Sequence, residues 1–340
     1  MDQVMQRVGN LFTAFSSFEN LYSAWKKTAK GCGRTPERAQ FFQDLETELI
    51  ALQTEFRNDS WRPQPFRYFD IYDPKHRQIA VAPFRDRVVH HALVNVLELI
   101  FEKVFIADSY ATRKGKGVHA AVFKAQHFTA KYTFYLKTDV EKFFDSVCHN
   151  TLLQIIERKI KDRKILGVCE RLIRHGGTAG KGLPIGNRTS QFFANVYLNP
   201  LDHFIKAQCR VNGYVRYMDD FVLFENDKKR LLELRRTIED FLQEKLHLQL
   251  KEKATFLNRQ QNGLPFLGRR IFPSLIRLRT ENLRRIQKRL AFREKQFELG
   301  DIEETEFLHS MNSYWAMLSF YPELKPLRDN MIYSDARSFV

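Results

Sequence analysis

The sequence predicts an α+β fold, a β-sheet covered on one face by helices. One apolar, strand-like run ends at Asp139, and a second run, 215–224, carries the adjacent pair Asp219 and Asp220. From Asp139 onward the expected order is strand, helix, helix, hairpin, helix and short strands, which is typical of helices layered on a sheet. Apolar residues at three- and four-residue spacing on both sides predict helical ends.

Composition and charge narrow the class of protein. The chain has 340 residues, 44% of them hydrophobic, enough for a sizeable core and two or three subdomains. Its net charge of +15 favours a polyanionic partner, and we expect nucleic acid rather than a basic surface without a partner. The four cysteines lack Cys-x-x-Cys spacing, and no apolar stretch reaches the length of a signal peptide or a membrane span. We therefore expect a cytoplasmic protein with no membrane contact, no zinc site and no disulfide framework.

Residues 1–60 are expected to be mostly helical. The apolar spacing is interrupted at Gly31–Cys32–Gly33. A second helix then begins with Thr35 as its cap and Pro36 at its first position, and it continues to about Phe56. Its aromatic residues are expected to pack in the core.

Residues 61–131 are expected to form a basic hairpin and two helices around a loop. The hairpin turns at Asp73–Pro74–Lys75 and would suit a lid over phosphates, although an ordinary solvated hairpin has the same pattern. The loop 109–117 combines glycines with Arg113 and Lys114, which could meet a triphosphate, but simple connectors share this composition. The expected elements are strands at 66–72 and 78–81 and helices at 84–105 and 118–128.

The middle of the chain alternates helices with short strands. A glycine-rich loop, 180–191, precedes a helix and could receive a base pair or a phosphate. The expected elements are helices at 151–175, 192–205 and 228–246 and strands at 248–250 and 264–271.

From about Ser274 the chain is expected to be helical to its end. Ten Lys or Arg residues and two acidic residues lie between positions 269 and 295, which favours contact with a phosphate backbone over a merely solvated helix. The core of this terminal helical part is expected to contain Tyr314, Trp315 and Phe320.

Three carboxylates suggest the chemistry. Two adjacent aspartates repel and lose solvation in a sheet, so Asp219 and Asp220 indicate a divalent cation between them. With Asp139 they supply the oxygen ligands that magnesium prefers, and phosphoryl transfer to a nucleotide uses two such ions roughly 4 Å apart. A glycosidase pair is the competing interpretation, but it explains neither the adjacent aspartates, nor the basic loops, nor the charge.

These motifs resemble those of reverse transcriptases. Tyr217–Met218–Asp219–Asp220 resembles their signature hairpin, and Asp139 with Phe143–Phe144–Asp145 is similar to their first palm motif. The resemblance covers roughly residues 60–275 in the right order. Its other parts are the palm loop Leu183–Gly186, the Lys-bearing motif Lys251–Thr255, the primer grip Pro265–Gly268 and the fingers loop Tyr110–Gly117.

The resemblance implies a right-hand polymerase fold. It implies an N-terminal helical extension (1–60), fingers (61–131), a palm (132–272) with a fingers insertion around 151–182, and a helical thumb (273–340). Asp139, Asp219 and Asp220, with the carbonyl of Val140, would hold two Mg²⁺ ions, with Mn²⁺ as a substitute. The implied nucleotide-binding residues are Arg113, Lys114, Val140, Phe144, Ile185, Gly186 and Gln191. The implied template and primer contacts are Arg85, Tyr217, Met218, Phe266, Leu267, Gly268, Arg284, Arg285, Lys288 and Arg289.

Phe144 and the palm loop sharpen the implied function. Phe144 stands where the family places the side chain that clashes with a ribose 2′-hydroxyl, although the residue alone could equally be a core aromatic. The segment from Ile185 to Gln191 is similar to that of reverse transcriptases from diversity-generating retroelements, whereas group II intron enzymes usually carry Gln-Gly where this chain has Ile185–Gly186.

Such bacterial or phage enzymes copy a template-repeat RNA into cDNA with errors opposite adenine, in the process called mutagenic retrohoming. They bind dNTPs and an RNA/cDNA duplex and work with a small basic pentameric accessory variability protein. Two alternatives stay open. One is another bacterial reverse transcriptase, either of phage defence or standalone and group II-like. The other is a catalytically silent RNA-binding protein on the same scaffold.

Overall fold

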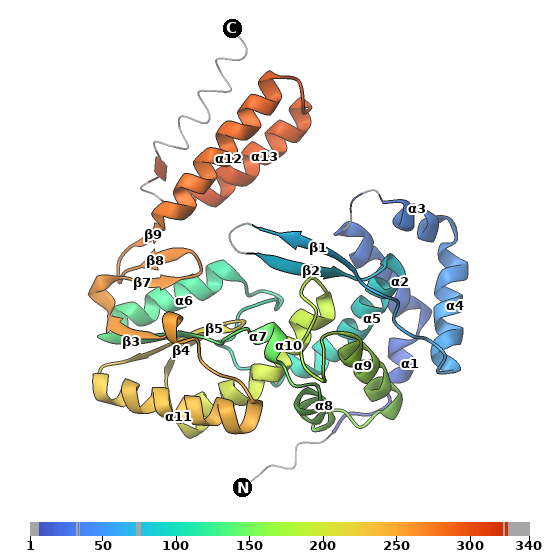
Figure 1. Ribbon diagram of the computed structural model, residues 1–340, viewed down its shortest axis with the longest axis horizontal. Coiled ribbons are helices and arrows are strands. Elements are labelled where there is room, and N and C mark those ends of the chain that lie inside the picture. Colours follow the sequence, from blue (N-terminus) through green and yellow to red (C-terminus); the bar gives the residue numbers. More distant parts are fainter. Residues whose placement is uncertain (1–6, 32, 34, 73–75, 322–323, 326–340) are drawn as a thin grey trace. The chain divides into compact units, whose positions relative to one another are not determined.

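The computed structural model describes residues 7–31, 33, 35–72, 76–321 and 324–325, and it confirms the α+β class (Figure 1). The chain divides into two compact units. Unit 1 comprises Met1–Ala121 and Leu136–Leu257, and unit 2 comprises Val122–Tyr135 and Asn258–Val340.

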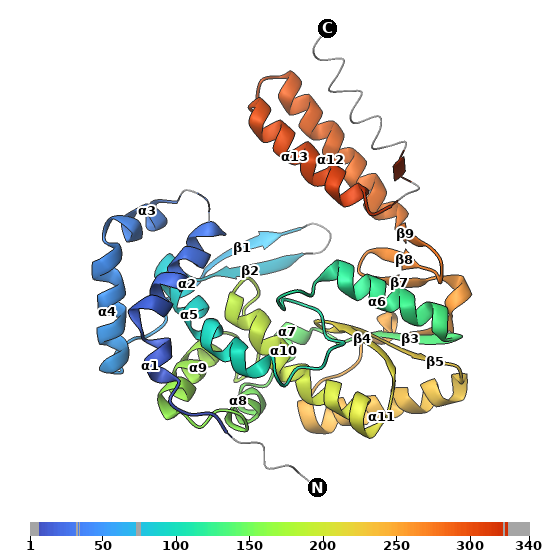
Figure 2. The same ribbon diagram turned by 180° about the vertical axis from the view of Figure 1, so that it is seen from behind.

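A four-stranded sheet in the order β4-β5-β3-β6 carries the aspartates. Its strands are β3 (Phe134–Asp139), β4 (Gly213–Tyr217), β5 (Asp220–Glu225) and β6 (Phe256–Arg259). The long helices α10 (Arg188–His203) and α11 (Lys228–Leu246) confirm the expected positions, and α11 packs against β5 (Figure 2). The strand expected at 248–250 is wrong. Leu250 forms only an isolated bridge to Val140, and the fourth strand is β6.

The N-terminal part of unit 1 is helical, as expected. Helices α1 (Phe12–Phe15), α2 (Phe18–Lys30), α3 (Pro36–Gln43) and α4 (Leu45–Arg57) precede the hairpin of β1 (Arg67–Ile71) and β2 (Arg77–Val81), and α2 packs along α5 (Phe84–Phe101). Thr35 caps α3 by accepting a hydrogen bond from the backbone N–H of Arg38. The helix expected to continue to Phe56 instead ends at Gln43, and α4 begins at Leu45. The expected turn Asp73–Pro74–Lys75 and Cys32 lie outside the described residues.

The single helix expected at 151–175 is wrong. The structure has two helices, α8 (His149–Glu157) and α9 (Arg163–His175), beside the short α7 (Phe143–Ser146). Asp162 separates them because its carboxylate accepts hydrogen bonds from the N–H groups of Lys164 and Ile165. The other carboxylate oxygen accepts from Leu11 at 2.8 Å and Phe12 at 3.0 Å, at the start of α1. One aspartate therefore serves two helix N-termini.

Unit 2 contains most of α6 (Val118–Lys131) and a three-stranded sheet. Its strands are β7 (Leu264–Phe266), β8 (Arg269–Ile271) and β9 (Ile276–Leu278). The single strand expected at 264–271 is a hairpin, since Leu267 and Gly268 both take left-handed backbone angles at its turn. The helix expected from Ser274 begins only at Thr280, after β9.

Helices α12 (Thr280–Glu298) and α13 (Glu304–Leu318) pack on each other in unit 2. Tyr314 packs against their core, but Trp315 and Phe320, also expected there, are each 43% exposed. The side chains that α12 and α13 bury against each other are mostly aliphatic and differ from those expected. The buried core consists of Ile286, Leu290, Phe307, Met311 and Leu318.

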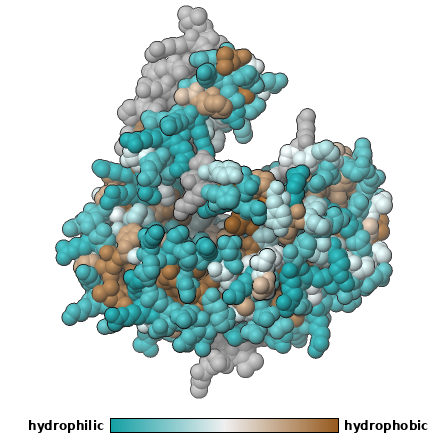
Figure 3. Space-filling view, in the orientation of Figure 1, coloured by the Kyte–Doolittle hydropathy of each residue, from teal (hydrophilic) through white to brown (hydrophobic). Residues whose placement is uncertain are grey.

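The hydrophilic character of the surface agrees with the high content of charged residues in the chain. The face in Figure 3 is mostly hydrophilic, with smaller apolar areas. Within the described part of the chain, no helix is long and apolar enough to cross a membrane. Cys148, Cys169 and Cys209 are free thiols.

Candidate active site

The site is organised around a two-residue turn between β4 and β5. Tyr217 pairs with Asp220, so Met218 and Asp219 form the turn. Met218 has φ 58°, a left-handed conformation that costs a non-glycine residue about 1 kcal/mol or more. Nη1 of Arg216 donates a hydrogen bond to the carbonyl of Met218 at 3.0 Å. This contact fixes the turn and places Asp219 at its tip.

Arg216 is itself fully buried. Its Nε and Nη2 donate to the two carboxylate oxygens of Asp202, at 2.7 and 2.5 Å. Nη1 also donates to Asn195, and the hydroxyl of Tyr214 donates to Asp202 at 2.8 Å. Burial lowers the pKa of Arg216, but the charges and hydrogen bonds of Asp202 and Tyr214 together outweigh that effect, and the pKa is raised. The ion pair therefore stays charged inside the protein and anchors the hairpin to α10.

The structure brings Asp219 and Asp139 together. Burial, reinforced by the negative charge of Asp139, raises the pKa of Asp219 to about 6, while Arg77 of β2 acts in the opposite direction. Burial also raises the pKa of Asp220 to about 7, although Lys137 opposes this shift. Nζ of Lys137 lies 2.9 Å from Oδ1 of Asp220 in an ion pair whose geometry is not that of an aligned hydrogen bond.

The three aspartates fit a divalent cation by their chemistry. Burial and the negative charge of Asp139 raise the proton affinity of Asp219, so a cation shared by the two carboxylates would stabilise them, and oxygen donors suit a hard ion such as Mg²⁺. In the described part of the chain, no three acidic, His or Cys side chains are grouped so that they could hold a metal ion. Of the three aspartates, Asp220 forms an ion pair with Lys137. Asp139 and Asp219, which interact directly, would be the first two ligands of such a cation, and Asp220 would be a third donor.

The loop after Leu183 lies directly on the hairpin strand β2. The N–H of Ala80 donates to the carbonyl of Ile185 at 2.8 Å, and Nδ2 of Asn187 donates to the carbonyl of Ala80 at 3.0 Å. At Gly186, with φ 118°, a Cβ would lie 2.7 Å from Cγ2 of Ile79 and 2.8 Å from the carbonyl oxygen of Ala80. Only glycine allows this close approach.

A groove of about 500 Å³ runs between this loop and the hairpin. Ile185 lines it together with Arg77, Lys181, Tyr68 and Asp145. The groove thus combines aromatic, cationic and apolar side chains next to the residues expected at the nascent base pair.

The two phenylalanines of the first palm motif differ in burial. Phe143 is buried, as expected for a core aromatic, whereas Phe144 is half-buried and its carbonyl accepts from the N–H of Leu183 at 2.7 Å. The side chain of Val140 is buried, and the N–H of Lys251 donates to the carbonyl of Asp139 at 2.8 Å. The end of β3 is therefore fixed from two sides.

Arg113, expected at the nucleotide, and Arg85, expected at the template or primer, are both occupied by protein groups. Arg113 donates to Glu102, to the carbonyls of Ile106 and Ser109 and to the hydroxyl of Ser109, and its side chain is 6% exposed. Because all its nitrogens are used, it holds the loop rather than facing a triphosphate, while Lys114 of the same loop is exposed.

Arg85 is likewise a structural residue. It binds Glu48 through Nε at 2.8 Å and Glu55 through both terminal nitrogens. Its acidic partners on α4 are thirty or more positions away, so the sequence around Arg85 did not indicate them.

The remaining expected residues lie as follows. Tyr217, Met218 and Gln191 are half-buried in unit 1. In unit 2, Phe266 is buried, Leu267 and Gly268 form the turn between β7 and β8, and Arg284, Arg285, Lys288 and Arg289 lie on α12.

Sequence reasoning missed Lys137, Arg77 and Arg216. Lys137 lies two positions before Asp139 on the same strand, so the alternation of β3 could have placed both on one face. Arg216 was visible as a cation in an apolar strand, which indicates a buried partner, but nothing local identified Asp202.

Known proteins are similar to this chain in sequence and in fold. The family model for reverse transcriptase (RNA-dependent DNA polymerase) matches residues 72–271. Protein YkfC of Escherichia coli is 27% identical over 67% of this chain and 72% of its own, and the group II intron-encoded protein LtrA of Lactococcus lactis is 25% identical over 70% of this chain and 41% of its own. The chain thus spans less than half of LtrA.

Among solved structures, apo telomerase from Candida tropicalis has a TM-score of 0.50 at 14% identity, over 64% of this chain and 49% of that one. At that identity the likeness concerns the polymerase fold alone. The family match covers more than half of the sequence and includes the strands that carry all three aspartates. The chain belongs to the reverse transcriptase family.

Proposed function

We propose that this protein is the RNA-directed DNA polymerase of a diversity-generating retroelement and makes adenine-mutagenic cDNA from a template-repeat RNA. The observation that carries the proposal is the loop from Ile185 to Gln191. Its glycine is seated on β2, and Ile185 lines a groove together with Arg77, whose charge acts on Asp219. The net charge of +15 supports a nucleic-acid substrate.

The domain boundaries are part of this proposal. Residues 1–60 form the helical extension, 61–131 the fingers, 132–272 the palm with its insertion around 151–182, and 273–340 the thumb. A small basic pentameric accessory protein is the proposed partner, on the resemblance of the loop alone.

The proposed chemistry assigns one role to each side chain. Asp139, Asp219 and Asp220, with the carbonyl of Val140, would hold two Mg²⁺ ions, which activate the primer 3′-hydroxyl and neutralise the triphosphate when bound. Phe144 would exclude the ribose 2′-hydroxyl. Primer extension on poly-rA/oligo-dT, with and without the co-encoded basic protein, tests the activity, and its absence would favour a silent RNA-binding protein.

Ile185 is the proposed source of infidelity. Replacing it by glutamine restores a polar group that can hydrogen-bond near the nucleotide, so misincorporation opposite template adenine should fall by about 10-fold. The backbone contact to Ala80 does not depend on the side chain, so the loop should keep its position. Sequenced cDNA gives the error rate, Ile185→Val serves as the control that keeps a branched apolar side chain, and an equal error rate in both variants would rule out this role.

Phe144 is the proposed sugar gate. Phe144→Ala opens space beside the incoming nucleotide, and the discrimination against ribonucleotides should fall by about 10- to 100-fold. The measurement is kcat/KM for rATP against dATP, and Phe144→Tyr should retain the selectivity. If the alanine variant keeps its preference for dATP, Phe144 is a packing residue.

A second candidate is a group II-like enzyme, which the similarity to LtrA favours. A template repeat and variable repeat beside the gene would distinguish the two, because only the retroelement needs them.

A further inference from the structure

Four aromatic rings form a near-parallel ladder across α2 and α3. Phe18 and Tyr22 have ring centroids 6.3 Å apart at an interplanar angle of 9°. Tyr22 and Trp25 follow at 5.4 Å and 27°, and Trp25 and Phe42 at 5.9 Å and 14°. Core aromatics in this chain mostly meet at steeper angles, such as 52° for Phe15 with Phe56. The rings therefore stack on one another, and Phe42 stands at one end of the stack.

The ladder borders an open groove of about 630 Å³. Tyr22, Trp25 and Phe42 line it, and Ala29 and Ala39 leave room between the two helices. Phe42 closes the ladder and is 62% exposed, a large apolar area to leave in water. The volume is sufficient for one nucleotide with its sugar.

The rim of this groove is cationic. Lys26, Lys30 and Arg38 line it, and none of its described lining residues is acidic. Nζ of Lys26 lies 4.4 Å from the centroid of Tyr22, a cation–π contact, and Lys30 is exposed at the C-terminus of α2. Ring faces between cations are the combination that binds unpaired nucleic acid, because bases stack on the rings and phosphates meet the charges.

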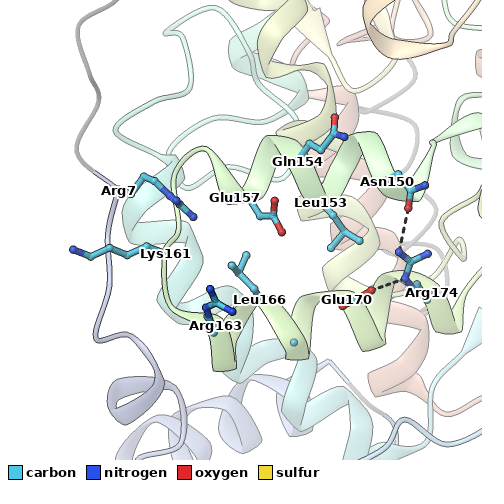
Figure 4. A pocket seen from close by; sticks show the side chains of 11 residues that line it. Arg7, Asn150, Leu153, Gln154, Glu157, Lys161, Arg163, Leu166, Glu170 and Arg174 are labelled. Atoms are coloured by element: carbon cyan, nitrogen blue, oxygen red, sulfur yellow. Dashed lines mark hydrogen bonds and ion pairs between the residues drawn. The ribbon is translucent and has the colours of Figure 1, made fainter.

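A second groove provides the comparison. It lies between α8 and α9 and measures about 760 Å³, and none of its described lining residues is aromatic (Figure 4). Glu157 and Glu170 lie among its cations, and Arg174 is bound to Glu170 and Asn150. That groove therefore offers neither stacking nor a uniform positive rim.

We propose that the groove between α2 and α3 binds single-stranded RNA, with a base stacked on Phe42 and the flanking phosphates at Lys26 and Lys30. The inference rests on the proposed function, since it gives the same RNA a contact outside the catalytic cluster. A protein partner with an apolar helix is disfavoured, because the rim is cationic and the apolar surface consists of stacked rings rather than an aliphatic stripe.

The test measures binding of a short fluorescent oligo-rA by full-length protein preloaded with an RNA/DNA primer–template duplex. Phe42→Ala should weaken the affinity by about 5- to 100-fold, and Phe42→Trp should restore it. An abasic oligomer should bind wild-type protein about as weakly as oligo-rA binds the alanine variant. Lys30→Gln should reduce the slope of log K against log salt by about 0.7. Ile50→Ala removes another exposed apolar side chain, on α4 outside the groove, and should change nothing.

Equal affinities for wild type and Phe42→Ala would overturn the proposal, as would equal affinities for oligo-rA and the abasic oligomer. Primer extension by the wild-type protein is measured in parallel. If the protein extends the primer but its binding of oligo-rA does not depend on Phe42, reverse transcription is supported and this binding site is ruled out. Phe42-dependent binding without extension keeps the site and removes the proposed polymerase function.

Discussion

Asp219→Asn is expected to lower kcat for DNA synthesis on the order of 10³-fold or more, while the affinity for RNA stays largely unchanged. Asparagine has the same size as aspartate but cannot supply the negative oxygen that, with Asp139, would hold the proposed cation. The turn should keep its geometry, because Arg216 holds the carbonyl of Met218 and not the side chain of Asp219. Primer extension gives kcat, and fluorescence anisotropy gives the RNA affinity. Retained dNTP incorporation would remove the carboxylate assignment.

The same variant has an independent readout in metal-free buffer. The pKa of Asp219 is raised to about 6 in the folded protein, so on raising the pH the unfolded chain loses this proton before the folded one does. Its contribution to stability therefore falls as pH rises from about 4 to 6 and is constant above that range. The Tm of Asp219→Asn relative to wild type should rise across this window, and Mg²⁺ should stabilise only the wild type. A pH-independent difference would contradict the buried pair.

Arg216→Met is expected to destabilise the protein by about 3–5 kcal/mol. The substitution leaves the carboxylate of Asp202 buried without its cation and releases the carbonyl of Met218. The free energy of unfolding from urea titration gives the loss. In the fraction that remains folded, the affinity for metal should also fall, because the turn that presents Asp219 has lost its anchor.

Two further variants make this result specific. Removing the partner charge as well, in Arg216→Met with Asp202→Leu, should recover much of the stability. Arg174→Gln breaks the exposed pair with Glu170 and should cost less than about 1 kcal/mol. A loss at Arg216 no larger than that at Arg174 would show that the buried pair does not support the hairpin.

Local patterns predicted the elements whose causes are local. The hairpin at Asp219–Asp220 follows from strand residues around a turn, and helix α11 from its apolar spacing. Asp139 could be associated with Asp219 because each follows an apolar run that is typical of a buried strand.

Features set by distant partners could not be predicted. The spacing in 151–175 is helical throughout, but Asp162 interrupts it, since its carboxylate also binds N–H groups near residue 11. Arg113 has the composition of a phosphate contact, and only the fold shows Glu102 beside it. In both cases the sequence shows the charged group but not its partner.

The position of Asp162 also bears on the order in which the molecule is assembled during synthesis. The N–H of Leu11 receives its partner from a residue 151 positions later in the chain. Closing so long a loop is slow compared with forming a local turn. Helix α1 therefore obtains this partner only after the start of α9 has been synthesised.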